Sequence, residues 1–321
     1  MTKILILGGA GMVGRKLISR LASNPITPDQ AITVCDIVTP DSPSAGVTYV
    51  EASLTDTAVL RNLVTRRPDV IFHLASIVSG EAEMDFDKGY AQNMFPVWEM
   101  LEAIRATSAE SAYCPRLVFT SSIAVFGGPF PDKIDDDFLC APQTSYGAQK
   151  LICETLISDF SRKGFVDGIS IRLPTICVRP GKPNLAASSF FSGIIREPLN
   201  GQRAALPVST SVRHWHASPR SAAGFLTHAA ALDTALLGGR RALNMPGLSA
   251  TVEEQIEALR KAAGQSAVAL IDKVPDASIA KIVDGWPRDF APSRALELGF
   301  QAEETFDEIV SVYLEEDMPS A

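Results

Sequence analysis

The first fourteen residues combine an apolar run with three regularly spaced glycines. Lys3–Leu7 is an apolar run of strand length, and Gly8, Gly11 and Gly14 follow it before an amphipathic helical pattern begins. Gly8 is expected to supply the dihedral angles of a tight turn, Gly11 to let the backbone approach a pyrophosphate, and Gly14 to let the helix pack closely. Phosphates bind well at the N-terminus of such a helix. The segment therefore predicts a dinucleotide-binding strand, turn and helix.

An acidic residue at the end of the next apolar run supports this interpretation. The run Ala31–Asp36 ends in a carboxylate, and Ile37 follows it. A carboxylate at this place binds the hydroxyl groups of the adenosine ribose and repels a 2′-phosphate, for which Ile37 offers no cation. The sequence predicts NAD in preference to NADP, although Asp36 could also simply cap a strand.

Charge and cysteine content limit the class of protein. The chain of 321 residues has a formal net charge of −8 and no basic cluster, which argues against a nucleic-acid partner. No apolar run reaches the length of a membrane span, and the N-terminus leads directly into the first strand without a signal peptide. The five cysteines are scattered, which predicts reduced thiols in the cytoplasm rather than disulfides or a zinc site.

Strands and helices alternate through the first half of the chain. Further strands are expected at 47–50, 69–75, 116–121 and 169–173, with helices at about 53–66, 82–107 and 144–162. This alternation predicts an α/β fold, a Rossmann-type doubly wound parallel sheet. From Pro174 onward prolines divide shorter pieces, before a helix expected at about 303–314. We expect a nucleotide-binding domain at 1–173 and a smaller C-terminal substrate lobe at 174–321, with some chain returning to the first domain.

The residue types needed for alcohol oxidation follow the fifth strand. Tyr146 and Lys150 are four residues apart on a predicted helix, so their side chains share one face. A tyrosine hydroxyl, with its usual pKa near 10, is a poor base, but a neighbouring ammonium and a cationic nicotinamide favour the phenolate. Ser122, where a strand ends, can hold the substrate oxygen while Tyr146 takes its proton. The three residues predict hydride transfer between an alcohol and a nicotinamide.

The glycine turn, Asp36, Ser122, Tyr146 and Lys150 together resemble the extended short-chain dehydrogenase/reductase superfamily, in its NAD-dependent epimerase/dehydratase group. The likeness covers essentially the whole chain, and within the group the chain is most similar to the D-erythronate dehydrogenases, with supporting stretches at 72–76, 183–190 and 213–215. The resemblance implies an NAD-dependent dehydrogenase that oxidises a secondary alcohol of a small sugar acid, D-erythronate, to 2-oxo-tetronate. Ser122, Tyr146 and Lys150 would be the catalytic residues.

The resemblance also implies a set of cofactor contacts. These are, by position, Gly8, Gly11, Met12, Val13, Asp36, Leu54, Ala75, Ser76, Asn93, Tyr146, Lys150, Pro174 and Val178. Two departures stand out. Ser53 replaces an Asp that many relatives use to bind the adenine, and the segment 213–217 keeps Arg213 but lacks the acids usual in enzymes of nucleotide sugars.

A small hydroxy acid needs a cation for its carboxylate, and arginine suits this because its fork binds both oxygens. The candidates are Arg179, Lys182 and Arg213, and our hypothesis is that Arg179 or Arg213 binds the acid. The candidates for binding hydroxyl groups are Ser76, Ser122, Tyr146, and Asn184 or Ser188.

Other interpretations are weighed against this one. His214 and His216 share one face of a strand, but no third ligand follows, so we expect no metal. A nucleotide-sugar epimerase or dehydratase and a non-catalytic NAD-sensing protein are the rival functions. The resemblance also implies a homodimer formed by the helices at 85–107 and 144–162, although their apolar residues are equally consistent with packing on the sheet.

Overall fold

The computed structural model describes residues 1–181 and 186–318. The chain divides into two compact units. The first unit contains residues 1–125, 142–172 and 223–243, and the second contains residues 126–141, 173–222 and 244–321. The candidates Lys182 and Asn184, and part of the stretch 183–190, lie outside the described residues.

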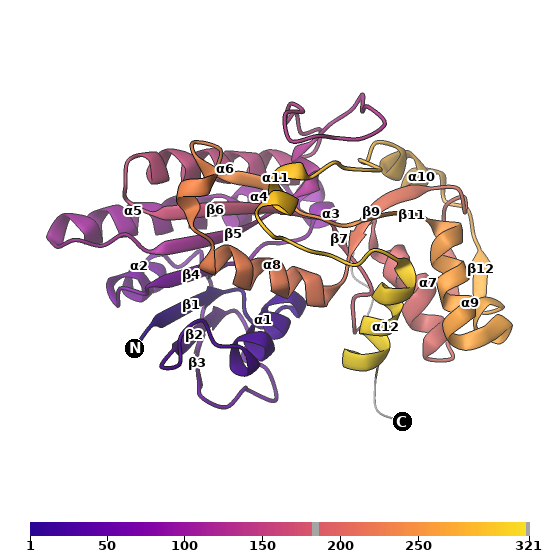
Figure 1. The fold of residues 1–321 in the computed structure, drawn as a ribbon, viewed down its shortest axis with the longest axis horizontal. Helices are drawn as coiled ribbons and strands as arrows, with labels where there is room; N and C mark the ends of the chain where they lie inside the picture. The colour runs from indigo at the N-terminus through magenta and orange to yellow at the C-terminus, as the bar shows by residue number, and fades with distance from the viewer. Residues whose placement is uncertain (182–185, 319–321) are drawn as a thin grey trace. The chain divides into compact units, whose positions relative to one another are not determined.

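A seven-stranded sheet forms the centre of the first unit (Figure 1). Its strands are β1 (Lys3–Leu7), β2 (Ala31–Asp36), β3 (Val47–Glu51), β4 (Val70–His73), β5 (Arg116–Ser122), β6 (Asp167–Leu173) and β10 (Ala242–Asn244), in the order β10-β6-β5-β4-β1-β2-β3. Strand β1 pairs in parallel with β2 and β4, and β2–β3 and β4–β5 are also parallel. The sheet order reverses direction beside β1, which confirms the predicted doubly wound α/β fold.

Helices cover both faces of this sheet. Helices α2 (Thr57–Thr65), α5 (Phe95–Glu110) and α6 (Ser145–Arg162) bury apolar residues against β1, β4 and β5 in one core cluster. Helix α1 (Met12–Ser23) and helix α8 (Pro219–Ala231) lie in front of the sheet in Figure 1, joined by a hydrogen bond from Arg20 to Thr227. The side chains of Asp56 and Thr144 cap α2 and α6, as their residue types favour.

The prediction of a single helix at 82–107 is wrong. The structure has three helices there, α3 (Ser79–Met84), α4 (Phe86–Asn93) and α5. Asp85 ends the first and caps the second, because its carboxylate accepts the N–H of Lys88. Pro96 lies in the first turn of α5, where a proline is tolerated but cannot continue the preceding helix.

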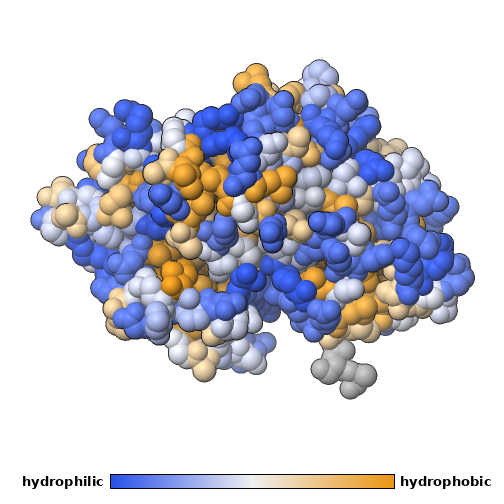
Figure 2. Space-filling model, viewed as in Figure 1, coloured by the Kyte–Doolittle hydropathy of each residue, from blue (hydrophilic) through white to orange (hydrophobic). Residues whose placement is uncertain are grey.

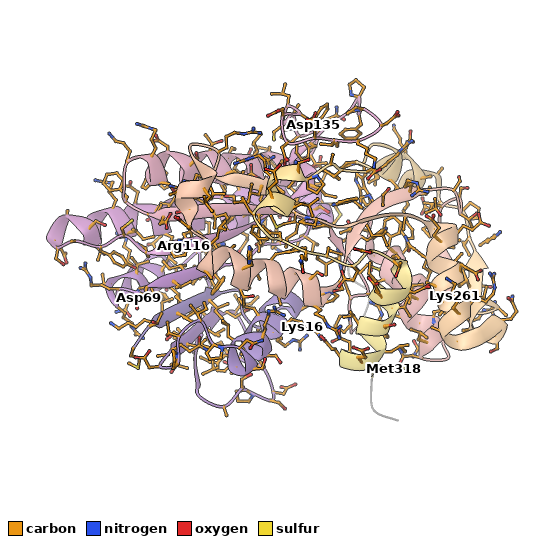
Figure 3. All side chains as sticks on the ribbon, viewed as in Figure 1. Lys16, Asp69, Arg116, Asp135, Lys261 and Met318 are labelled. Atoms are coloured by element: carbon orange, nitrogen blue, oxygen red, sulfur yellow. The ribbon has the colours of Figure 1, made fainter. Side chains whose placement is uncertain are left out.

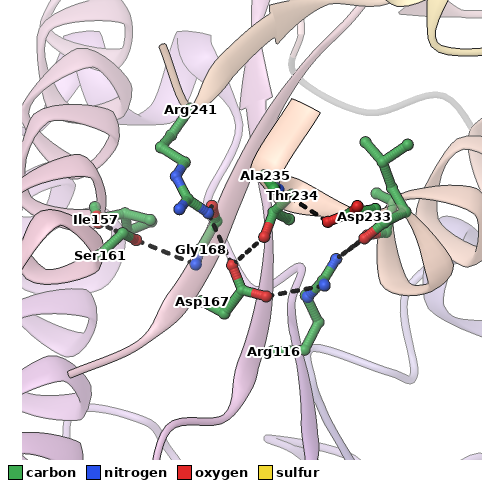
Figure 4. A network of polar contacts seen from close by, with 11 residues as sticks. Arg116, Ile157, Ser161, Asp167, Gly168, Asp233, Thr234, Ala235 and Arg241 are labelled. Carbon is green, nitrogen blue, oxygen red and sulfur yellow. Dashed lines mark hydrogen bonds and ion pairs between the residues drawn. The ribbon is translucent and has the colours of Figure 1, made fainter. Parts of the chain in front are cut away.

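A half-buried network of ion pairs joins the amino ends of β5 and β6 to the 3₁₀ segment Thr234–Leu237, η2 (Figure 4). The carboxylate of Asp167 pairs with Arg116 at 2.8 Å and Arg241 at 2.7 Å, and accepts the Thr234 hydroxyl at 2.5 Å. Arg116 also donates to the carbonyls of Ala229 and Leu232. These contacts lie at the edge of the sheet opposite the glycine turn, so the network is structural.

The described part of the second unit is built from short strands and five helices that surround its own core. One sheet has the order β11-β9-β7 and a second pairs β12 with β8. The elements are β7 (Thr175–Ile176), α7 (Ser189–Leu199), β8 (Ala204–Leu206), β9 (Arg213–Ala217), β11 (Leu248–Thr251), α9 (Val252–Val268), β12 (Ile271–Lys273), α10 (Ala277–Asp284), α11 (Ser293–Glu297) and α12 (Phe306–Glu316). Phe190 and Phe191 lie in this core.

Polar side chains lie on much of the face of the second unit that Figure 2 shows. The side of α9 away from its core is mostly hydrophilic in Figure 2, and Lys261, labelled in Figure 3, pairs with Asp307 of α12 at 2.7 Å. Asp135, in the loop at the top of Figure 3, is exposed, and the neighbouring Asp136 accepts the N–H of Arg294. None of the described helices is both long and apolar enough to span a membrane.

Candidate active site

The glycine turn after β1 is as tight as the spacing predicts. Gly8 has φ +86°, and a Cβ there would lie 2.5 Å from the backbone nitrogen of Ala75, so the turn after β4 passes directly beside it. A Cβ at Gly14 would lie 2.5 Å from the Cα of Gly9, so the first turn of α1 packs against the turn itself. Any side chain at either position would push these backbones apart.

Gly11 differs from the other two, because no described residue crowds this position. It has an ordinary φ of −66°, and within the described part of the chain a Cβ would meet only the Gly8 carbonyl oxygen, at a normal 3.6 Å. It is the exposed N-cap of α1, where the first N–H groups of the helix have no acceptor within the helix. A glycine there keeps open the space in front of these donors, and a phosphate group suits that space.

Asp36 lies next to this turn at the carboxyl end of β2. Its Oδ2 accepts the N–H of Ala10 at 2.8 Å, which fixes the carboxylate beside the phosphate position. The side chain is half-buried, and Ile37 beyond it is exposed. The glycine turn and Asp36 therefore fit a dinucleotide with free ribose hydroxyls.

The turn after β4 is hydrogen-bonded to a buried asparagine, Asn93. Asn93 is almost fully buried, and its Oδ1 accepts both the N–H of Ile77 at 2.8 Å and the Ser76 hydroxyl at 3.1 Å. Its Nδ2 donates to Oε1 of Gln149 on α6 at 2.7 Å. Asn93 therefore supports the turn that carries Ala75 and Ser76, and the side chain of Leu54 is also buried.

Tyr146 and Lys150 lie together at the carboxyl end of the sheet, against the strand that ends in Ser122. The Lys150 side chain is 2% exposed, its Nζ donates to the Thr120 carbonyl at 2.9 Å, and it lies 5.6 Å from the centre of the Tyr146 ring. Ser122 is the last residue of β5, and its Oγ accepts the N–H of Ala124 at 3.1 Å. Because β1 and β5 flank β4, this group lies on the same edge of the sheet as the glycine turn.

Gly147, which sequence reasoning missed, allows the close approach of α6 to this strand end. A Cβ at Gly147 would overlap the carbonyl oxygen of Ala124, in the 3₁₀ turn that follows Ser122, and lie 2.9 Å from Pro142. A glycine inside a helix costs about 1 kcal/mol relative to alanine. Its position directly after Tyr146 was the available signal.

Another buried polar residue near the group, Glu154, was also missed. Glu154 is the third member, after Tyr146 and Lys150, of a series spaced by four on α6, and it is paired with Arg172 and Ser121. His73 on β4 is fully buried, and burial together with the charge of Lys150 lowers its pKa to about 3. A neutral His73 adds no charge near Lys150.

The two arginines expected to bind the acid both belong to the second unit, where they have different partners. Arg213 donates to the Ser249 carbonyl at 2.9 Å and pairs with Glu254 at 3.4 Å. Arg179 donates to the Ile176 carbonyl at 2.9 Å and to the Ser188 hydroxyl at 3.3 Å.

Arg179 also influences the two histidines that alternate with Arg213 on β9. Burial lowers the pKa of His214 to about 4 and lowers that of His216, and the charge of Arg179 adds to both shifts. Because side chains alternate along a strand, Arg213 points to the other face of β9 from these histidines. Pro174 and Val178 are buried in the same unit.

The histidine pair is used for packing and hydrogen bonding. Nδ1 of His214 faces the Pro287 carbonyl at 3.0 Å and therefore carries the proton, and Nε2 faces the Thr175 hydroxyl at 2.7 Å. The His214 ring stacks on Phe191 at 5.2 Å, and His216 contacts Gln255. Among the described residues, no three His, Cys, Asp or Glu side chains are grouped as metal ligands.

Known proteins are similar to this chain in sequence. Residues 4–228 match the model of the NAD dependent epimerase/dehydratase family. The chain belongs to that family. It is 45% identical to a D-erythronate dehydrogenase from Cupriavidus necator and 42% identical to one from Haemophilus influenzae, each covering 98% of this chain and at least 98% of the relative.

A solved structure is also very similar over nearly the full length. The crystal structure named as a nucleoside-diphosphate-sugar epimerase from Agrobacterium tumefaciens is 55% identical, with a TM-score of 0.94 over 98% of this chain and 94% of that one. The family and the dehydrogenase relatives confirm the predicted resemblance and the prediction of an oxidoreductase.

Proposed function

We propose that the protein is an NAD-dependent dehydrogenase that oxidises a secondary alcohol of a small sugar acid, D-erythronate, to 2-oxo-tetronate. The observation that carries the proposal is the buried Lys150 ammonium between the Tyr146 ring and the Thr120 carbonyl. It is hydrogen-bonded to the strand that ends in Ser122, on the sheet edge that carries the glycine turn. The two full-length relatives named as D-erythronate dehydrogenases support the choice of substrate.

The residues around the glycine turn would hold the cofactor. The N–H groups of Met12 and Val13, in the first turn of α1, would bind the pyrophosphate in the space left by Gly11. The carboxylate of Asp36 would accept hydrogen bonds from the adenosine ribose. Gly8, Leu54, Ala75 and Ser76 would border the nucleotide, while Asn93 keeps the Ala75–Ser76 turn in place. We place Pro174 and Val178 beside the nicotinamide amide by resemblance.

The chain's own groups would carry the proton. Ser122 Oγ would donate to the substrate oxygen and orient it, and Tyr146 Oη would remove the proton of the same hydroxyl. The Lys150 ammonium would stabilise the phenolate of Tyr146 and bind the nicotinamide ribose. When bound, NAD accepts the hydride from the substrate carbon that bears this hydroxyl.

A cation for the substrate carboxylate is proposed at Arg179 or Arg213. Arg179 holds its guanidinium half-buried against Ser188, itself a candidate for binding substrate hydroxyls. Arg213 is already paired with Glu254. The acid would compete with Glu254 for Arg213.

One experiment tests the proposed reaction against its main rival. The purified protein is mixed with NAD and D-erythronate, then with other four- to six-carbon aldonates and uronates, and NADH is followed by absorbance. We expect NADH to accumulate with D-erythronate and not with a UDP-sugar.

The rival is a nucleotide-sugar epimerase, which returns the hydride within each turnover, and the Agrobacterium relative's name favours it. Interconversion of a UDP-sugar without net NADH, and no turnover of any free acid, would establish the rival instead.

We also propose a homodimer in the cytoplasm. Phe95 and Trp98 of α5 and Ile152 of α6 are 52%, 40% and 37% exposed, while Val97 and Leu101 pack inside the unit. The exposed three are the apolar residues that a second copy would cover in the proposed dimer. Sedimentation velocity should show a dimer that becomes a monomer in Trp98→Glu, and a monomeric parent protein would refute the dimer.

The proposed cytoplasmic location is supported by the five cysteines, which are all free thiols, as a reducing compartment keeps them.

A further inference from the structure

Glu154 is a buried carboxylate that the proposed chemistry does not use. It lies on α6 one turn beyond Lys150 and two turns beyond Tyr146, and its side chain is 4% exposed. Oε1 accepts the hydroxyl of Ser121 at 2.5 Å, and Arg172 on β6 donates to both carboxylate oxygens. All these residues belong to the first unit.

A buried ion pair of this kind needs a reason beyond stability. Burying two charges costs roughly as much as their attraction returns, and an apolar pair of similar volume would often stabilise a core at least as well. The fork from Arg172, with Nη2 2.7 Å from Oε2, instead fixes the orientation of the carboxylate. The carboxylate then presents one oxygen to a single hydroxyl, that of Ser121.

The bond to Ser121 completes a two-point attachment of α6 to the end of β5. Lys150 holds the carbonyl of Thr120, and Glu154, one turn further, holds the side chain of the next residue, Ser121. Ser122 follows immediately. Because the attachment involves consecutive strand residues and two turns of one helix, α6 cannot shift along β5 without breaking one of the two bonds.

We propose that Glu154, oriented by Arg172, is a positioning residue that sets the placement of Ser122 relative to Tyr146 through its bond to Ser121. The inference builds on the catalytic roles given above to Ser122 and Tyr146, but on no particular substrate. A displacement of about 1 Å between reacting groups lowers turnover up to 100-fold, so one buried hydroxyl would have a measurable effect.

The test compares two deletions of one buried hydroxyl. Ser121→Ala removes the bond to Glu154 and leaves the ion pair intact. Ser170→Ala on β6 is the matched control, because Ser170 is fully buried and its hydroxyl has no hydrogen-bond partner among the described residues. We expect Ser121→Ala to lower kcat by about 10- to 100-fold with KM for NAD within twofold, and Ser170→Ala to change neither.

A readout that needs no substrate separates this inference from the proposed function. Hydrogen exchange of the amides at 122–125, which include the Ala124 N–H bonded to Ser122, should be faster in Ser121→Ala than in the parent protein or Ser170→Ala. Unchanged exchange, or equal effects of the two deletions, would overturn the positioning role. A parent protein inactive on sugar acids would refute the proposed function and leave the exchange result to decide this one.

A second variant guards against a general loss of structure. The double variant Glu154→Gln with Arg172→Gln removes both charges. The amide oxygen at position 154 can still accept the Ser121 hydroxyl, and the amide at position 172 faces the amide at position 154. We expect its kcat to exceed that of Ser121→Ala at least threefold, because the hydroxyl keeps an acceptor. A kcat as low as that of Ser121→Ala, in a variant with parental Tm, would contradict the role given to the bond.

Discussion

The ammonium of Lys150 lies 5.6 Å from the centre of the Tyr146 ring while it donates to the Thr120 carbonyl at 2.9 Å. One contact brings the charge beside the phenol, and the other fixes it to the strand that ends in Ser122. Helix α6 and strand β5 are thus joined by the same side chain that would tune the proton acceptor.

Gly11→Ala should weaken NAD binding without destabilising the protein. A methyl group there meets only the Gly8 carbonyl at 3.6 Å, and φ is −66°, so the fold accepts it. It would nevertheless occupy the space in front of the helix N–H groups. We expect the Kd for NAD, measured by calorimetry, to rise at least tenfold with Tm unchanged. Gly285→Ala, with its nearest atom at 3.5 Å, is the control. Unaltered NAD affinity in Gly11→Ala would place the cofactor elsewhere.

Asp36→Ala combined with Ile37→Arg should shift the cofactor preference toward NADP. The carboxylate that repels a 2′-phosphate is lost, and a cation is supplied at the exposed neighbouring position. The ratio of kcat/KM for NAD to that for NADP should fall at least 100-fold. A parent enzyme equally efficient with both cofactors would refute the role of Asp36.

The two arginines of the second unit should differ in their effects on substrate binding. Replacement of the arginine that binds the acid by alanine should raise KM for D-erythronate about 10- to 100-fold, with KM for NAD unchanged, because a charge-assisted pair is lost. The other replacement should act as its control. If neither Arg179→Ala nor Arg213→Ala changed KM for the acid, both assignments would be wrong.

Asp167→Asn should destabilise the protein in a pH-dependent way. Burial would raise the pKa of Asp167, but the hydrogen bonds from Thr234 and Arg241 and the charge of Arg116 outweigh it, so its pKa is lowered on folding. A carboxyl group with a lowered pKa stabilises the fold above its unfolded pKa of about 4, and this stabilisation is lost as pH falls through the folded value. At pH 7 the variant should lose about 2 kcal/mol.

The difference in Tm between Asp167→Asn and the parent should therefore shrink below about pH 4. Thermal unfolding followed by circular dichroism between pH 3 and 8 measures it. A Tm difference that is constant over this range would show that the ion network contributes no pH dependence.

Sequence reasoning found the residues whose spacing is local. Gly8, Gly11 and Gly14 lie on one turn, and Tyr146 and Lys150 lie on one helix, so a period or a spacing reveals them. The same reasoning missed the break of the helix at Asp85. An aspartate can either continue a helix or cap the next one through a hydrogen bond to the backbone, and the residue type alone does not decide between the two.

The supporting residues depend on contacts between distant segments. Asn93 meets Gln149, and Glu154 meets Arg172 and Ser121, across separations from 18 to 56 residues that no periodicity encodes. Glu154 continues the spacing of four from Tyr146 and Lys150. Its place on the same helix face as these two residues was the sequence signal available. The position of the acid-binding cation likewise depends on tertiary contacts, and it stays a prediction.

The most direct test of the account is Tyr146→Phe, which removes only the hydroxyl that would take the proton. NADH formation with D-erythronate and the Kd for NAD are measured for the parent, the variant and the control Tyr49→Phe, whose hydroxyl lies on β3. We predict that kcat falls about 10³-fold in Tyr146→Phe alone, with NAD affinity within threefold of the parent. Turnover by Tyr146→Phe at the parental rate would contradict the account.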